Sequence, residues 1–331
     1  MPTTDHRTVE CRSGLREVRI PERVTVSSQS RDNIFVAGLI LTLNDIGPTL
    51  VTGATGFLGR HVLGAWLASA RPVSALTRRV DAAARPGAQW FRIEDLCDRV
   101  NIRRALAGIG TVIHLAARAH VMRERVADPL SAYRKVNVEG TRVLLEEAVA
   151  AGVRHFVFVS SVKAMGERAH VPWTEASQPS PSDAYGVTKL EAERLVQDVA
   201  SRTGLRTVTL RFPLVYGEGM RGNMLQLFSA VARGWPLPFR NVNNLRSYLY
   251  AGNAVAAIEA VLKCSQVGGE LFLVSDGLNL STPELIRAVG SALARRVGLI
   301  PVPNAFLRLG ARVGDVIVRL TDWPFTSQSY E

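Results

Sequence analysis

The chain has few of the residues that mark disulfide-rich, metal-binding or membrane proteins. Its 331 residues include only three cysteines, Cys11, Cys97 and Cys264. Their wide spacing fits neither a disulfide framework nor a metal-binding pattern, so we expect no metal and a reducing, cytoplasmic compartment. The apolar stretch at 34–43 is too short to cross a bilayer, which takes about 20 residues. Since no basic segment leads directly into an apolar one, a signal peptide is not expected either.

A concentrated basic block is also missing. The formal net charge is +11, but the 40 Lys and Arg residues are spread along the chain. Scattered basic residues favour anionic small ligands over nucleic acid. We therefore expect no nucleic-acid partner and no stable membrane insertion.

Three glycines stand where an apolar strand gives way to a helical pattern, within the run Val51-Thr52-Gly53-Ala54-Thr55-Gly56-Phe57-Leu58-Gly59. A tight turn whose backbone approaches a ligand requires residues without side chains, and the helix start offers free N–H groups to a phosphate. This spacing predicts a dinucleotide-binding turn. The alternative is a loop that needs glycine only for turning.

Apolar runs alternate with helical patterns after this turn. The alternation indicates an α/β protein. We expect a poorly ordered extension at 1–46, because its many charged residues follow no period. The NAD(P)-binding core is predicted at 47–210. A mixed region at 211–331 is predicted to complete the sheet at about 245–275 and to form the smaller domain.

The end of the second predicted strand, 73–77, bears on cofactor choice. Arg78 and Arg79 follow it directly, where this fold meets the adenosine ribose. Because an arginine there accommodates a 2′-phosphate, we expect NADP as the first choice and NAD as the second. The alternative is two surface arginines at a strand end.

A hydroxyl, a phenol and an amine form the predicted catalytic group. Ser161 ends the apolar strand that begins at 155, and Tyr185 and Lys189 lie four residues apart on a predicted helix, on one face. A nearby ammonium is expected to lower the pKa of the phenol towards the range of a general acid/base. Tyr-x-x-x-Lys by itself is more often a solvated helix face; the glycine turn and the serine reverse that judgement.

These residues together resemble a known family, the extended short-chain dehydrogenase/reductases and, within them, the NAD-dependent epimerase/dehydratase family of nucleotide-sugar enzymes. The resemblance runs from about residue 48 to 303. The matching segments are the glycine turn, His114-Leu115-Ala116-Ala117, Asn137-Val138-Glu139-Gly140-Thr141, Val159-Ser160-Ser161, Tyr185 with Lys189, and Arg211-Phe212-Pro213-Leu214-Val215-Tyr216-Gly217.

The resemblance implies an α/β fold with a doubly wound parallel (Rossmann) sheet and a small C-terminal substrate-binding domain. It also implies roles for individual residues. Tyr185 would be the acid/base, Lys189 would tune it and hold the nicotinamide ribose, and Ser161 would be the hydroxyl partner. The substrate would contact Ser161, Asn223 and Arg246, and the last two would grip its diphosphate. The cofactor would contact Gly53, Thr55, Gly56, Phe57, Leu58, Arg78, Arg79, Asp95, Leu96, Leu115, Ala116, Ala117, Lys189 and Phe212. A homodimer is implied as well.

The resemblance implies chemistry at C4 of a UDP-hexose or hexosamine, in surface-polysaccharide biosynthesis. Dehydratases carry Asp-Glu directly after the serine or threonine, whereas Val162 and Lys163 stand here, so dehydration is disfavoured. Arg78 and Arg79 favour a 4-keto reductase, and a UDP-sugar 4-epimerase is the alternative.

Other positions depart from the family pattern. Met165 precedes Gly166 where Tyr-Gly is usual, and Asn253 stands where Asp is usual. The segment after Trp323-Pro324-Phe325 lacks the usual closing region. An alternative of another class is therefore kept, a decayed or non-catalytic NADP-binding protein.

Overall fold

A computed structural model gives the fold of the protein. It describes residues 46–78, 86–119, 128–169, 171–264 and 268–303, with the backbone of four short strands before them. The chain divides into two compact units, 1–213 with 249–277 and 214–248 with 278–331.

The first unit contains a seven-stranded sheet in the described residues, with the order β13-β10-β9-β8-β5-β6-β7. Every neighbouring pair is parallel. The chain winds outward from β5 in both directions, so the strand order reverses between β5 and β8, the place where such sheets bind ligands at their carboxyl ends. The strands are β5 (Thr49–Thr52), β6 (Val73–Thr77), β7 (Gln89–Arg92), β8 (Thr111–His114), β9 (His155–Ser161), β10 (Arg206–Phe212) and β13 (Glu270–Leu273).

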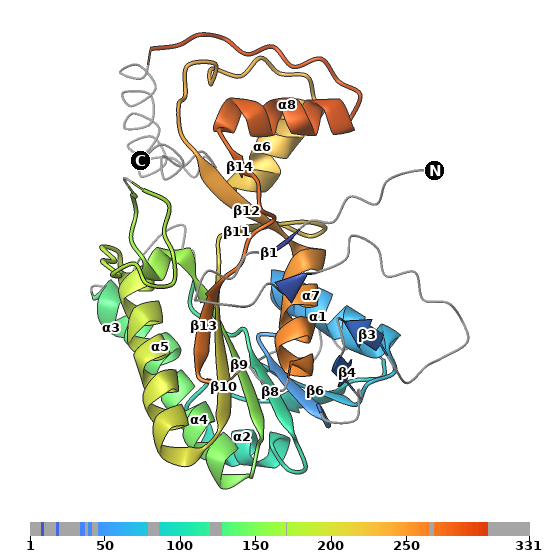
Figure 1. The fold of residues 1–331 in the computed structure, drawn as a ribbon, viewed down its shortest axis with the longest axis vertical. Coiled ribbons are helices and arrows are strands. Elements are labelled where there is room, and N and C mark those ends of the chain that lie inside the picture. The colour runs from blue at the N-terminus through green and yellow to red at the C-terminus, as the bar shows by residue number, and fades with distance from the viewer. Residues whose placement is uncertain are drawn as a thin grey trace. The chain divides into compact units, whose positions relative to one another are not determined.

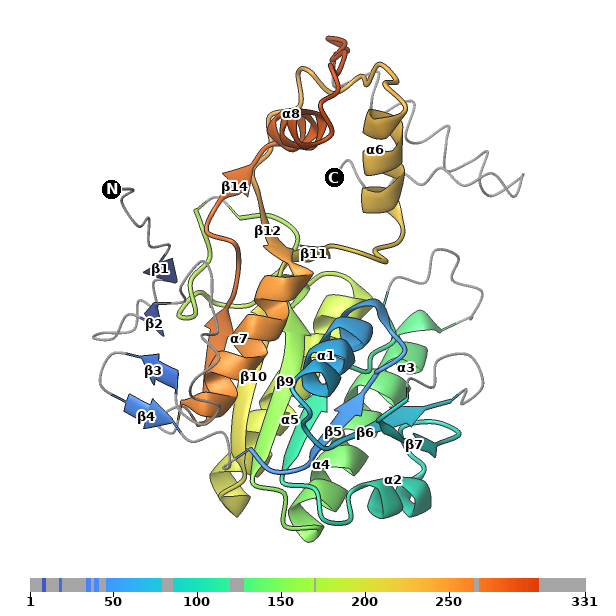
Figure 2. The same ribbon diagram turned by 90° about the vertical axis from the view of Figure 1, so that its right-hand side faces the viewer.

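Helices cover both faces of this sheet (Figures 1 and 2). One face packs against α1 (Phe57–Ala68) and α7 (Ala251–Lys263), which also touch each other. The opposite face carries α2 (Arg99–Ala105), α4 (Gly140–Ala150) and α5 (Ala184–Thr203). The helix α3 (Pro129–Arg134) runs through a π-helical turn, Lys135–Glu139, into α4, and a 3₁₀ turn, Val162–Ala164, follows β9. The predicted doubly wound α/β fold is confirmed.

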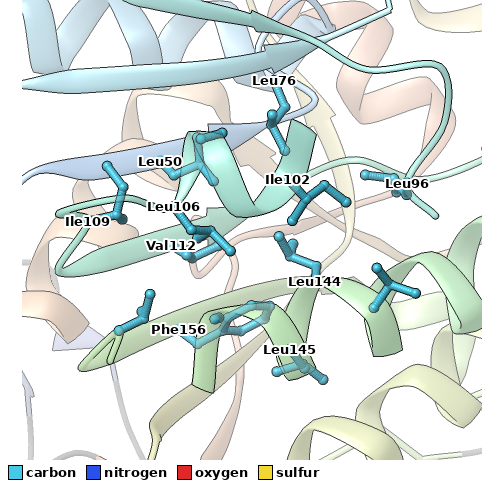
Figure 3. Close-up of a cluster of buried hydrophobic side chains, with 14 of the residues drawn as sticks. Leu50, Leu76, Leu96, Ile102, Leu106, Ile109, Val112, Leu144, Leu145 and Phe156 are labelled. Carbon is cyan, nitrogen blue, oxygen red and sulfur yellow. The ribbon is translucent and has the colours of Figure 1, made fainter. Parts of the chain in front are cut away.

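A core of aliphatic and aromatic side chains lies between the sheet and α2, α4 and α5 (Figure 3). Leu50, Val112 and Phe156 from three neighbouring strands are fully buried there, together with Leu144 and Leu145 of α4. Strands covered on both faces need apolar residues at successive positions, which is why β5 and β8 are buried at every residue.

The second unit has a three-stranded sheet in its described part, ordered β11-β12-β14. Its helices α6 (Asn223–Ala232) and α8 (Thr282–Ala292) pack on each other. A capping box between Ser281 and Glu284 starts α8. The strands are β11 (Leu214–Tyr216), β12 (Arg246–Tyr250), whose last two residues belong to the first unit, and β14 (Asn279–Leu280). Of the segment predicted to complete the large sheet, β13 does so, whereas β12 pairs with β14.

Both ends of the chain lie largely outside the described residues. Before residue 46 the backbone forms two antiparallel pairs, β1 (Thr8–Val9) with β2 (Val18–Arg19) and β3 (Ile34–Val36) with β4 (Leu39–Leu41). The remaining residues of the predicted poorly ordered extension, and residues 304–331 with the predicted altered end, fall outside the description. Among the described residues, no helix is both long and apolar enough to cross a membrane.

Candidate functional site

The glycine turn packs so tightly that side chains are excluded from it. Gly53 has φ +68°, and a Cβ there would lie 2.7 Å from the backbone N of Ala116. A Cβ on Gly59 would overlap the carbonyl oxygen of Gly53. The N–H of Gly56 donates to the same oxygen at 2.9 Å. The glycines therefore let α1 pack close to the end of β5 and let the backbone of β8's loop approach the turn.

The start of α1 keeps its donors available to a ligand. Gly56 is the N-cap and makes no side-chain capping bond, so N–H groups of the first turn have no capping side chain. Thr55 and Gly56 are exposed, and Phe57 and Leu58 are half-buried. This cradle suits a dinucleotide diphosphate, because the N–H groups and the helix dipole both favour an anion.

The other predicted cofactor residues gather after the carboxyl ends of neighbouring strands. Arg78 follows β6 and is exposed, and Phe212 is the buried last residue of β10. Arg79 lies outside the described residues. Asp95 accepts a hydrogen bond from the N–H of Cys97 at 2.7 Å. The remaining members are Leu96, which packs beneath α4 at Gly140, and Leu115, Ala116 and Ala117, which follow β8.

A buried histidine ties these strand ends together. His114 is 1% exposed, with Nδ1 2.6 Å from Thr52 Oγ1 and Nε2 2.9 Å from Thr141 Oγ1. Thr141 donates its proton to the carbonyl of Asn137 at 2.7 Å, so its oxygen accepts from His114 Nε2–H. The hydroxyl of Thr52 then donates to Nδ1 and accepts from the N–H of Ala116 at 3.2 Å.

This hydrogen-bond pattern assigns a neutral Nε2–H histidine. Burial agrees with it, since desolvation, helped by the charge of Lys189, lowers the pKa of His114 to about 3. In the sequence His114 is only one member of the motif that ends in Ala117, and its hydrogen-bonding role was not predicted. The available signal was a histidine closing an otherwise apolar strand, which must find polar partners when buried.

The hydrogen bonds continue from this histidine to the helix α5. Asn137 donates to Thr188 Oγ1 at 3.0 Å and to the carbonyl of Arg118 at 3.1 Å, and accepts from the N–H of Arg118 at 2.7 Å. Thr188 donates to the carbonyls of Ala184 and Tyr185 at 2.8 and 3.0 Å. The loop after β8 and the first turn of α5 are thereby held in one network.

The structure brings the predicted Ser161, Tyr185 and Lys189 into one region. Ser161 ends β9 and shares a side-chain hydrogen bond with Tyr185 in the first turn of α5. Lys189 lies one turn further along α5, where its Nζ donates to the carbonyl of Val159 at 2.7 Å and lies 4.0 Å from the ring centroid of Phe158. All three therefore meet at the carboxyl end of β9.

The ionisation of these groups differs from the sequence-based expectation. Burial raises the pKa of Tyr185 to about 12, against the hydrogen bond from Ser161, which lowers it, and with help from Asp183 and Tyr133. Burial lowers the pKa of Lys189 to about 7, opposed by Glu193. Burial therefore outweighs the expected lowering of the phenol pKa by Lys189, whose amine donates to the main-chain oxygen of Val159.

A buried ion pair supports the same strand ends. Arg211 of β10 donates to Glu193 of α5 through Nη2 at 2.6 Å and Nε at 3.0 Å. Ser160 also donates to Glu193. The unusual Met165 is 2% exposed, with its sulfur 2.5 Å from Arg211 Nη1. Met165 is therefore a buried neighbour of this pair.

The two predicted diphosphate residues lie in the second unit. Asn223 is the first residue of α6, after Gly222, and Arg246 is the first residue of β12, in register with Leu280. Their role in binding substrate stays a prediction.

The departure at Asn253 has a local explanation. Its Nδ2 donates to Asp276 Oδ1 at 2.8 Å, and both carboxylate oxygens of Asp276 accept from the N–H of Tyr250, at 3.1 and 3.0 Å. An aspartate at 253 would place a second carboxylate against Asp276, whereas asparagine supplies a donor.

Comparison with known proteins decides the family. The model of the NAD dependent epimerase/dehydratase family matches residues 49–274. The chain belongs to this family. A UDP-glucose 4-epimerase of Vibrio cholerae is 34% identical over 279 residues, which are 82% of this chain and 84% of the relative.

Two further proteins are similar to this chain. The N-acetyl-alpha-D-glucosaminyl-diphospho-ditrans,octacis-undecaprenol 4-epimerase of Escherichia coli O157:H7 is 30% identical over 274 residues, 82% of this chain and 80% of the relative. The solved structure of MoeE5 in complex with UDP-glucuronic acid and NAD has a TM-score of 0.67 and 32% identity, and the match covers 77% of this chain and 85% of that one. The protein is thus an enzyme of the nucleotide-sugar epimerase/dehydratase class with a nicotinamide cofactor.

Proposed function

We propose that this enzyme moves a hydride at C4 of a UDP-hexose or hexosamine, with 4-epimerisation as the first candidate reaction. The meeting of Ser161, Tyr185 and Lys189 at the end of β9 carries the proposal. Two of the three similar proteins compared above are named as 4-epimerases. The Val162–Lys163 pair after Ser161 supports epimerisation over dehydration, since a lysine cannot take the place of a carboxylic acid there.

Each residue has a distinct task in this proposal. Tyr185 takes the proton of the C4 hydroxyl and later returns it, and Ser161 donates to the same oxygen and orients it. A nicotinamide cofactor, when bound, supplies the group that accepts and returns the hydride. Its diphosphate would be held by the Gly53–Gly59 turn, and its ribose by Lys189. Asn223 and Arg246 would hold the substrate diphosphate, for which an arginine fork is well suited.

A 4-keto sugar reductase is the second candidate, favoured by one observation. Arg78 is exposed directly after β6, where an arginine accommodates a 2′-phosphate, as an NADPH-using reductase would need. MoeE5 is named as a complex with NAD, which supports the other cofactor. Titration of the protein with NADP and NAD decides: an Arg78→Ala variant that loses affinity for both equally excludes a 2′-phosphate contact at Arg78.

Three wider proposals accompany this activity. We place the enzyme in surface-polysaccharide biosynthesis and in the cytoplasm. We also propose a homodimer, because many members of the family pair through two helices. Sedimentation equilibrium of the full chain tests the last of these, and a monomer at all concentrations would exclude it.

The direct test is turnover of UDP-glucose, UDP-N-acetylglucosamine and UDP-glucuronic acid with NAD, followed by separation of the C4 epimers. Tyr185→Phe is the matched control, and we expect it to lose at least about a hundredfold in rate. Oxidation of NADPH by a 4-keto UDP-sugar without epimer exchange would indicate the reductase. Equal rates for the protein and Tyr185→Phe would remove the catalytic proposal. Cofactor binding without turnover of any of these sugars would favour a non-catalytic protein.

A further inference from the structure

Lys163 occupies a position that the proposed reaction does not use, yet its side chain joins two carboxylates beside the catalytic helix. Its Nζ donates to both oxygens of Glu167 at 2.5 and 2.6 Å and to Asp183 Oδ2 at 3.0 Å. Glu167 lies on the loop after β9, and Asp183 precedes α5. One ammonium therefore links the loop after Ser161 to the beginning of the helix that carries Tyr185.

The backbone of Lys163 touches the same two catalytic elements. Its N–H donates to Ser161 Oγ at 3.2 Å. A Cβ on Gly186 would overlap the carbonyl oxygen of Lys163, so residue 186 must be glycine for α5 to pack here. Asp183 caps α5 by accepting from the N–H of Gly186 at 2.6 Å. The position of Lys163 thus bears on Ser161 on one side and on the turn containing Tyr185 on the other.

The charges in this cluster act on Tyr185. Asp183 is one of the groups that raise the pKa of Tyr185. Burial works against the charged form of Lys163, but its bonds to Glu167 and Asp183 prevail and raise the pKa of Lys163. Burial likewise opposes the ionised form of Asp183, and the bonds from Gly186, Glu167 and Lys163 prevail and lower the pKa of Asp183. The lysine therefore stays cationic and offsets the carboxylate that disfavours a phenolate.

Other ionisable groups surround Tyr185 from different elements. The ring of Tyr133, on α3, lies edge-on to it with 6.3 Å between centroids. Arg118, in the loop after β8, lies 5.3 Å above the ring of Tyr133, and Lys189 lies one turn along α5. These groups do not change when Lys163 is replaced, so they form a constant background.

We propose that Lys163 is a positioning residue for the acid/base chemistry: by linking Glu167 to Asp183 it fixes Ser161 against the first turn of α5 and balances the negative charge beside Tyr185. The inference rests on the proposed function, since it assigns Tyr185 the proton transfer. The exposed fraction of the three side chains is 36–40%, so the ion pairs by themselves contribute little to stability. The effect of the lysine lies in the geometry and the local field.

The test replaces Lys163 with methionine, with Lys163→Arg as the conservative variant and Lys263→Met as the charge-matched control. Lys263 pairs with Glu259 on α7 at 3.4 Å, away from α5 in sequence and on the other face of the sheet. Ionisation of Tyr185 is read in the complex with NAD, because the positive charge of the oxidised nicotinamide favours the phenolate and brings its titration to a pH at which Lys163 is still cationic. The readout is tyrosinate absorbance after a rapid pH jump, as the difference between each variant and the same variant with Tyr185→Phe. This measurement needs no substrate.

We expect Lys163→Met to raise the apparent pKa of Tyr185 by roughly half a unit to one unit, because the carboxylate of Asp183, which disfavours the phenolate, is then uncompensated. Lys163→Arg should restore the original value, and Lys263→Met should leave it unchanged. Asp183→Asn keeps an oxygen for the helix cap while removing the charge, so it should shift the pKa of Tyr185 downward. An unchanged value in Lys163→Met, or equal shifts in Lys163→Met and Lys263→Met, would overturn the proposal.

Measurements of activity distinguish a failure of the proposed function from a failure of the inference about Lys163. With a turned-over UDP-sugar, the acidic limb of kcat/KM against pH should move upward in Lys163→Met by the same amount. If the unmodified protein turns over no sugar, the proposed function fails while the tyrosinate titration still tests Lys163. If the sugar is turned over and the acidic limb stays in place, the inference about Lys163 fails alone.

Discussion

Lys189, which was expected to activate the phenol of Tyr185, donates a hydrogen bond from its Nζ to the carbonyl of Val159 at 2.7 Å. The amine lies over the ring of Phe158 at 4.0 Å and is 2% exposed. An amine in such a site has a strongly reduced tendency to hold its proton. Because its pKa is about 7, Lys189 is close to half-protonated near neutral pH.

Replacing Lys189 with methionine should raise stability near pH 7 while abolishing turnover. The pKa of Lys189 is lowered to about 7 in the folded protein from 10.5. Its contribution to stability is thus complete above about pH 10.5 and is lost as the pH falls through about 7. The advantage of Lys189→Met in free energy of unfolding should shrink by about 1 kcal/mol per pH unit between pH 7 and 10. Urea unfolding at several pH values measures it, and a pH-independent difference would contradict the burial argument.

His114→Leu should destabilise the protein most at neutral pH. The variant leaves the hydroxyls of Thr52 and Thr141 without the ring, at a cost of about 2 kcal/mol. Because the pKa of His114 is lowered from 6.5 to about 3, the stability that the neutral ring provides is present above pH 6.5 and is lost as the pH falls through about 3. The difference in free energy of unfolding between the protein and His114→Leu should therefore narrow below pH 6.5. A gap that widens on acidification would show that the ring is charged in the folded state.

Gly59→Ala should impair both folding stability and cofactor binding. A Cβ there would overlap the carbonyl oxygen of Gly53 and lie 2.7 Å from Ala54 Cα, so α1 must move away from the turn. Overpacking of this kind costs about 1–3 kcal/mol, and we expect affinity for the dinucleotide to fall at least about tenfold. Gly298→Ala is the control, since its Cβ would meet Pro236 at an ordinary 3.7 Å. Equal cofactor affinity in both variants would separate the glycine from the cofactor site.

Asn253→Asp should destabilise the protein at neutral pH and recover in acid. The new carboxylate would face Asp276, which now accepts from Asn253 at 2.8 Å, and like charges at that distance raise the pKa of the pair. Stability relative to the unmodified protein should therefore improve as the pH falls below about 5 and one carboxyl takes a proton. The double variant Asn253→Asp with Asp276→Asn should recover at neutral pH, and thermal unfolding compares the three proteins. No recovery in the double variant would mean that repulsion from Asp276 is not the cause.

Much of the fold followed from local patterns. Glycines at 53, 56 and 59 require a tight strand-to-helix turn because only glycine has room there, and the structure places them in such a turn. Asp183, the N-cap of α5, likewise depends only on neighbours within three residues. Strand β12 lies in the segment that was expected to complete the large sheet, but it belongs to the three-stranded sheet. A short strand carries no local signal for the sheet that it joins.

The sequence by itself determined the elements and the chemistry available to them: the glycine turn, the parallel strands, and a serine, a tyrosine and a lysine at fixed positions. Only the tertiary structure decided the partners of these groups. Thr52, His114 and Thr141 meet across 89 residues of chain because β5 and β8 pair in register and α4 packs over them. The direction of Lys189 and the raised pKa of Tyr185 also depend on burial, which many distant residues produce together. Hydrogen bonding and desolvation act through space, and the order of residues along the chain does not contain those distances.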